Sequence, residues 1–313
     1  MSLQANAITF FQVIEQCRQI DEAPAGNNNC KIDGGEGNDY IESIGNNNIL
    51  DGGDDDDSIL SMGDYNNILG GDGNNSMLLS GNHNNITAKD GNNTVEIYGS
   101  VNKTVLGNGT NKYSSVGDEN EVTVGNGNNN DLEVEGNKNK ITVGNGNGNK
   151  LTALGDQNSA IFGDGNKNIL QMFGDKTDVK IGDGNDNSIL MVGNYGKLNV
   201  GNGNNKLGFW GDNFTAKFGN GNNIIRTLDW SFKNNEFTSW ADYYANNFVT
   251  YWIDEATNKV KGTIKGLNNT NINVGTGSNM INLTIGTDLN LVGADEEDER
   301  NEVIVNGQYD ISE

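Results

Sequence analysis

Short segments of alternating hydrophobic and polar residues recur along residues 27–227. Within each segment the apolar or small positions lie two residues apart, which puts their side chains on one face of a β-strand. Each repeat holds two such segments, so the pattern predicts two strands per repeat. The inward positions of the first segment are Leu50, Ile68, Ile86, Thr104, Val122, Ile141, Ala160, Val179, Leu198 and Ala216, and those of the second are Ile41, Ile59, Met77, Val95, Tyr113, Leu132, Leu151, Leu170, Ile189, Leu207 and Ile225.

Glycine-rich turns separate the segments and set the repeat length. Successive turns on one side begin 18 residues apart at first, as at Glu36, Asp54 and Asp72, and 19 apart from Asn126 to Asn202. A second glycine column marks the other side of the repeat. Because equivalent positions of successive coils would stack about 4.8 Å apart, we predict an all-β fold. It is a parallel β-solenoid of the two-sheet β-roll type, with 18–19 residues per coil and about eleven coils.

Asparagine forms a column of its own beside the second turn. Stacked amides can hydrogen-bond along a solenoid, as side-chain ladders do in cross-β stacks, and they can satisfy backbone groups of the turns. We therefore expect a structural role rather than a ligand-binding role for this column, which consists of Asn48, Asn66, Asn84, Asn102, Asn120, Asn139 and Asn158.

The segment 1–26 precedes the repeat. Residues 8–20 carry apolar residues on one helical face, among them Phe10, Val13 and Cys17. Since the end of a solenoid exposes unpaired strand edges, we expect an N-terminal capping helix here. A helix for secretion or partner binding is the alternative.

The segment 228–256 interrupts the repeat with a cluster of aromatic residues. We expect it to be partly helical, over 238–254, and to pack against the flank of the solenoid. The alternative is a recognition surface for a glycan or a protein, because aromatic residues dominate such surfaces. Solenoid coils are expected to resume over 257–313. The candidate partner-binding residues are Trp230, Trp240, Tyr243, Tyr244 and Trp252.

Composition and charge narrow the possible partners. Gly occurs 44 times, Asn more often still, and apolar residues make up 34% of the 313 residues, too few for a conventional layered core. A formal charge of -23 disfavours nucleic acid and anionic membranes and favours soluble cations. No stretch is long enough for a transmembrane segment, and no cleavable signal peptide is visible at the N-terminus. The two cysteines, Cys17 and Cys30, leave a single bridge open.

Enzymatic constellations are weak in this sequence. His83 is the only histidine and falls in a repeat turn, which disfavours histidine-based triads and histidine-rich metal sites. No phosphate-binding loop of the G-x-x-x-x-G-K-[ST] type occurs. Acidic residues are plentiful, but nothing singles out one catalytic pair, so we do not expect an enzyme.

Residues 34–42 read G-G-E-G-N-D-Y-I-E, and 52–60 and 70–78 repeat the pattern with one departure each. This nonapeptide resembles the repeats-in-toxin family, also called hemolysin-type calcium-binding repeats, whose pattern is G-G-x-G-x-D-x-U-x. The resemblance implies a β-roll that binds calcium in its turns, through Asp39 and Asp57 here, with Asp54 and Asp56 nearby. Independently, Glu36, Asp54 and Asp72 would stack at strand spacing, and such like charges require a cation.

From Asn75 onward the ligand aspartate is mostly replaced by asparagine, which brings no charge. We therefore expect few calcium sites, confined to the first coils. The alternatives are a roll loaded with calcium along its whole length and a solenoid stabilised by asparagine alone, without metal.

These observations predict a secreted or cell-surface scaffold or adhesion module that binds calcium in its first coils. The resemblance implies type I secretion and folding outside the cell. The alternatives are a carbohydrate-binding or carbohydrate-active solenoid that uses the aromatic segment, and a secreted toxin or effector. End-to-end self-association of coils also stays open.

Overall fold

The computed structural model describes residues 28–227, 251–254, 259–262, 267–274, 280–293 and 302–306, with side chains over 28–227 and at Ile272 and Asn273. The chain divides into two compact units, Met1–Thr152 and Ala153–Glu313. Within the described residues of both units the regular structure is β-strand, and no helix is present that could cross a membrane.

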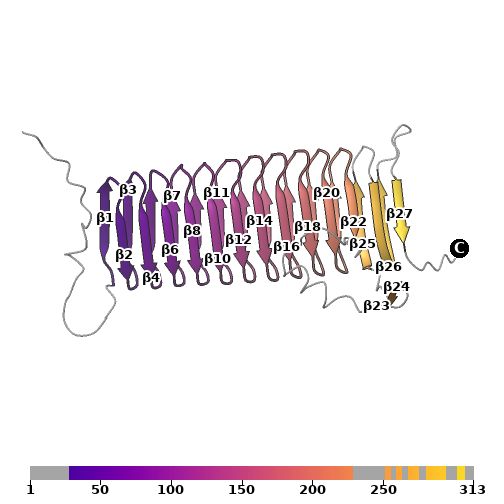
Figure 1. Ribbon diagram of the computed structural model, residues 1–313, viewed down its shortest axis with the longest axis horizontal. Helices are drawn as coiled ribbons and strands as arrows, with labels where there is room; N and C mark the ends of the chain where they lie inside the picture. The colour runs from indigo at the N-terminus through magenta and orange to yellow at the C-terminus, as the bar shows by residue number, and fades with distance from the viewer. Residues whose placement is uncertain are drawn as a thin grey trace, which may run out of the picture. The chain divides into compact units, whose positions relative to one another are not determined.

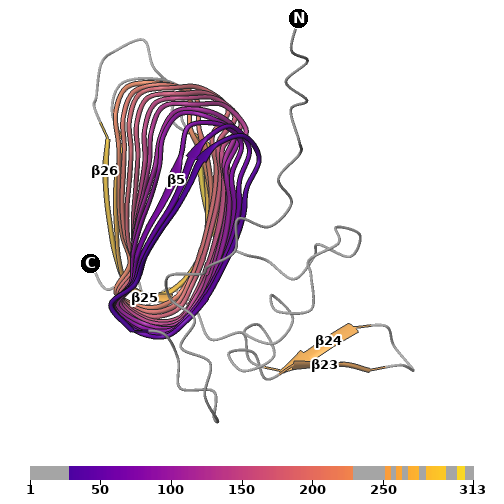
Figure 2. The same ribbon diagram turned by 90° about the vertical axis from the view of Figure 1, so that its left-hand side faces the viewer.

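The first unit is a parallel β-solenoid with two strands per coil (Figure 1). Strands with odd numbers form one sheet and strands with even numbers form the other. Seen along the coils, the two sheets face each other across the interior (Figure 2). Its strands are β1 (Lys31–Glu36), β2 (Tyr40–Ile44), β3 (Ile49–Asp54), β4 (Ser58–Met62), β5 (Asn67–Gly71), β6 (Ser76–Ser80), β7 (Asn85–Ala88), β8 (Thr94–Tyr98), β9 (Lys103–Leu106), β10 (Lys112–Val116), β11 (Glu121–Val124), β12 (Asp131–Glu135), β13 (Lys140–Val143) and β14 (Lys150–Leu154), the last of which runs across the boundary.

The second unit repeats this architecture, and its described residues add β25, β26 and β27 to the solenoid and a separate two-stranded sheet of β23 and β24. β25 pairs parallel with β21, and β26 pairs parallel with β22 and then with β25, so coil pairing resumes late in the chain. The strands are β15 (Ser159–Phe162), β16 (Ile169–Phe173), β17 (Asp178–Ile181), β18 (Ser188–Val192), β19 (Lys197–Val200), β20 (Lys206–Trp210), β21 (Thr215–Phe218), β22 (Ile224–Thr227), β23 (Tyr251–Asp254), β24 (Lys259–Gly262), β25 (Leu267–Val274), β26 (Met280–Gly293) and β27 (Glu302–Asn306).

The core is a set of single-file rows, one residue per coil. Val122 pairs in register with Thr104 on one side and Ile141 on the other, and all three are at most 2% exposed. The expected inward columns are confirmed in both units, since their members are buried while the residues between them face outward. Layering of like positions therefore supplies the apolar burial in a chain that is poor in apolar residues.

Close stacking of the turns explains the glycine columns. A Cβ added at Gly99 would lie 2.0 Å from the carbonyl oxygen of Gly81 in the preceding coil, and the φ of Gly99 is +144°. Both facts exclude a larger residue there.

The aromatic segment differs from expectation at its end. Residues 251–254, predicted to be helical, form strand β23, which pairs antiparallel with β24. Pairing with the Lys259–Gly262 segment satisfies the backbone in extended form and overrides the helical pattern read from the sequence. The predicted helix over 8–20 and the remainder of the one over 238–254 lie outside the described residues.

Candidate metal site

Two interior ladders of polar side chains run beside the two turns of each coil. The expected ladder, from Asn48 to Asn139 in the first unit, is buried, and each backbone N–H donates to the side-chain Oδ1 of the next coil over 2.7–2.8 Å. Its structural role is confirmed. A second ladder beside the first turn was not anticipated as such. Its members in the first unit are Asp39, Asp57, Asn75, Asn93, Asn111, Asn130 and Asn149, linked by the same type of hydrogen bond.

The second ladder begins with two carboxylates, and this is where a site arises. Asp57 is 3% exposed, and its Oδ1 accepts the backbone N–H of Asp39 over 2.9 Å. Its other oxygen, Oδ2, is buried without a hydrogen-bond partner, and so is Oδ2 of Asp39. A buried carboxylate oxygen without a donor is costly, so both residues lack a positive partner.

Backbone carbonyls lie next to these oxygens. A Cβ added at Gly52 would lie 2.3 Å from Oδ2 of Asp57 and 2.8 Å from the carbonyl oxygen of Gly70. A Cβ added at Gly34 would lie 2.6 Å from Oδ2 of Asp39 and 2.4 Å from the carbonyl oxygen of Gly52. The same arrangement thus occurs twice: a carboxylate oxygen and a carbonyl oxygen converge where glycine leaves space.

The third coil shows what replaces this arrangement. Asn75 occupies the next place in the ladder, and its Nδ2 donates to the carbonyl oxygens of Gly71 and Asp72 over 3.5 and 3.3 Å. Asn93 and Asn111 donate in the same way to Lys89 and Gly107. The amide therefore places a donor against the turn carbonyls, whereas an aspartate in the same place sets acceptor against acceptor. A cation or a proton resolves that conflict.

The pKa values follow from this setting. Burial raises the pKa of Asp57 to about 6. The N–H of Asp39 opposes this rise, and the negative charges of Asp39, Asp55 and Asp56 add to it. Burial also raises the pKa of Asp39.

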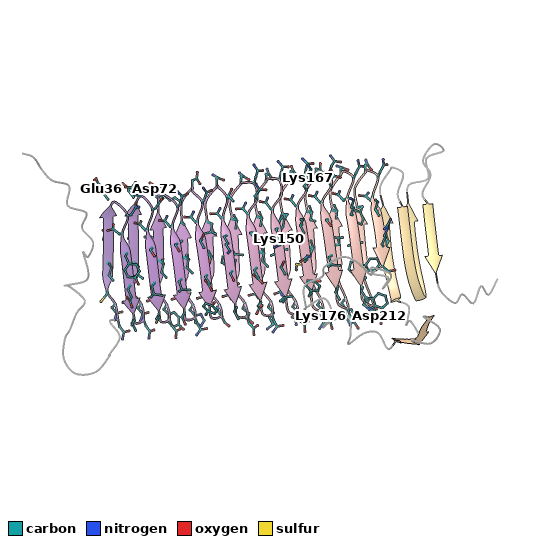
Figure 3. All side chains as sticks on the ribbon, viewed as in Figure 1. Glu36, Asp72, Lys150, Lys167, Lys176 and Asp212 are labelled. Atoms are coloured by element: carbon teal, nitrogen blue, oxygen red, sulfur yellow. The ribbon has the colours of Figure 1, made fainter. Side chains whose placement is uncertain are left out.

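The other sequence candidates lie elsewhere on the turn. Glu36, Asp54, Asp56 and Asp72 are exposed, and Figure 3 shows Glu36 and Asp72 at the turn edge of the first unit. Asp56 accepts hydrogen bonds from the backbone N–H and Nδ2 of Asn74, while Asp72 lies 3.1 Å from Nζ of Lys89. In the part of the chain with described side chains, no three His, Cys, Asp or Glu residues gather into a metal-binding group. Any site here combines Asp39 or Asp57 with carbonyls.

No protein-family model, curated protein or solved structure matches this chain.

The remaining candidates contribute less to this site. Among the aromatic candidates, Trp230, Trp240, Tyr243 and Tyr244 lie outside the described residues, and Trp252 lies in β23 without a described side chain. His83 stacks on Tyr65 with ring centroids 4.8 Å apart. Cys30, just before β1, is disulfide-bonded, while Cys17 lies outside the described residues.

The sequence contained a signal for the second ladder. From β6 to β22 an asparagine stands two positions before the first inward residue of each even-numbered strand, as at Asn75 and Met77. The same spacing relates Asp39 to Ile41 and Asp57 to Ile59, so the two aspartates and the asparagines share one structural position.

Proposed function

We propose that this protein is an exported extracellular or cell-surface scaffold or adhesion module whose first two coils bind calcium. The observation that carries the calcium proposal is the change of ladder residue between Asp57 and Asn75. Where asparagine stands, its amide donates to the turn carbonyls; where aspartate stands, Oδ2 is buried without a donor. The resemblance to the repeats-in-toxin nonapeptide agrees with this assignment.

The residues present suit calcium better than other common metals. Their donors are carboxylate and carbonyl oxygens, which hard cations prefer, and calcium tolerates irregular geometry better than magnesium does. Asp39 and Asp57, with the carbonyls of Gly52 and Gly70, would hold the ion. Because only two carboxylates contribute, we expect a dissociation constant on the order of 10⁻⁴–10⁻³ M, the range of extracellular modules.

Export is supported by two further features. A disulfide at Cys30 suits an oxidising compartment. A formal charge of -23 favours solubility, and neutralisation by cations relieves self-repulsion. Carbohydrate recognition and carriage of a toxin or effector stay predictions.

Calcium titration followed by thermal melting tests the proposal. Calcium at about a hundredfold above its dissociation constant stabilises the bound state by about 2.7 kcal/mol. Circular dichroism should therefore show a higher melting temperature in calcium than in chelator. Magnesium at the same concentration serves as the control, and a variant with Asp39→Asn and Asp57→Asn should not respond. An identical melting temperature in calcium and chelator would remove the metal from the proposal.

A further inference from the structure

In the five-residue even-numbered strands, β2 to β20, the last residue alternates away from the interior and lies next to the second turn. In the first unit large apolar residues at this position are exposed: Ile44 52%, Met62 41%, Tyr98 48% and Val116 43%. In the second unit Leu154 at this position is half-buried, and the residues after it are buried: Phe173 4%, Val192 7% and Trp210 8%. We call these last three residues the covered row.

Stacking of neighbouring coils does not account for this difference. Phe173 pairs in register with Val192, and Val192 with Trp210, just as Val116 pairs with Tyr98 in the first unit. The same ladder contacts leave Tyr98 and Val116 more than 40% exposed. Gly174 and Gly193, which follow the covered row, are also buried, whereas Gly99 and Gly117 are partly exposed. Another part of the protein therefore covers this row.

The path of the chain identifies the segment responsible. After Trp210, the four-residue turn 211–214 leads directly into β21. After Thr227, which pairs with Phe209, the next strand of the solenoid is β25 in the opposite sheet, which starts only at Leu267. Residues 228–266 thus stand where other coils have a short turn. They follow directly on Thr227, whose partner Phe209 precedes Trp210 of the covered row.

The composition of this interval matches the surface. Its first part carries the main aromatic cluster of the chain, including Trp230, Phe232, Phe237, Trp240 and Phe248. Exposed aromatic residues in such number would form an apolar patch that a soluble protein rarely leaves uncovered. A row of Phe, Val and Trp side chains gives these rings a partner with matching chemistry.

We propose that the covered row, Phe173, Val192 and Trp210, is a docking surface for residues 228–250 of the same chain. The segment attaches beside the row, has the apolar side chains to fill it, and accounts for burial that neighbouring coils do not provide. The turns after β16 and β20, marked by Lys176 and Asp212 in Figure 3, border this surface. This docking is independent of the calcium proposal.

Tryptophan quenching tests the occupant. With Trp230→Phe, Trp240→Phe and Trp252→Phe, Trp210 is the only fluorophore of its kind, and acrylamide should quench it weakly. Replacing Phe232, Phe237 and the residues at 230 and 240 by serine should raise the quenching constant several-fold. The matched control carries Val116→Trp with Trp210→Phe, and its quenching should not change with the serine replacements. Equal quenching of Trp210 with and without the aromatic side chains overturns the proposal.

A reciprocal experiment changes the surface instead of the segment. Val192→Asp should release the segment and speed tryptic cleavage at Lys233. Val116→Asp, the same change at the equivalent but exposed position of β10, should leave cleavage unchanged. Circular dichroism confirms that both variants keep their strands. Equal cleavage rates in folded Val192→Asp and in the unchanged chain contradict the proposal. Protection that disappears on dilution, together with a dimer in sedimentation, also overturns it, because the occupant would then be a second copy.

Discussion

Replacing Asp57 by asparagine should stabilise the first coils when calcium is absent. The substitution extends the asparagine ladder by one place and removes a buried carboxylate whose Oδ2 has no donor. It keeps Oδ1, which accepts the N–H of Asp39. The new Nδ2 can donate to the turn carbonyls of its own coil, as that of Asn75 does.

The size of the stability gain expected for Asp57→Asn follows from the pKa of Asp57. Burial raises the pKa of Asp57 from 3.8 to about 6, so the folded state binds the proton more tightly than the unfolded state. Stability therefore falls as pH rises from about 4 to above 6, and the full penalty is present at pH 7.5. At about 1.36 kcal/mol per pH unit this penalty is at most about 3 kcal/mol, and water near the turn reduces it. With about 0.5–1.5 kcal/mol for the added hydrogen bond, Asp57→Asn should gain about 2–4 kcal/mol.

Amide hydrogen exchange over β1 to β6 measures this gain, because coils of a repeat protein open locally. The experiment is done in chelator at pH 7.5 and at pH 5, where the folded state of the unchanged protein is already largely protonated at Asp57. The gain should be smaller at pH 5. Asp56→Asn, at an exposed turn position, is the matched control and should change little. A loss of protection in Asp57→Asn, or a gain equal at both pH values, would refute the reasoning.

Two further predictions concern other parts of the solenoid. Asn102→Leu removes the acceptor for the N–H of Asn84 and the donor to the carbonyl of Gly81. The free energy of unfolding measured in urea should therefore fall by about 2–4 kcal/mol. Asn85→Leu, at an exposed position, should change it little. Val101 has a φ of +61°, which strains a β-branched residue, so Val101→Asn should raise stability by about 1 kcal/mol. Val105→Asn, on the neighbouring strand, is its control in thermal melting; no gain at position 101 would show that the turn does not carry this strain.

The solenoid itself was predictable because every coil repeats nearly the same length. With 18–19 residues per coil, identical positions must lie in the same row, and the apolar and asparagine columns read from the sequence are the rows of the structure. In such a fold, residues separated by one repeat length in the sequence are neighbours in space. The C-terminal coil pairing was also foreseen, from the return of alternating apolar residues near Ile272.

The sequence by itself determined the repeat, its two strands per coil, and which side chains form the interior rows. Only the tertiary structure decided how far each acidic residue is buried and whether its oxygens find a donor, since Asp57 is buried with Oδ2 unpaired while its chain neighbour Asp56 is exposed and hydrogen-bonded. That difference depends on turn dihedral angles and on contacts with the coils before and after. The burial of Trp210 and the strand at Tyr251–Asp254 were likewise decided by partners distant in sequence, which local periodicity does not report.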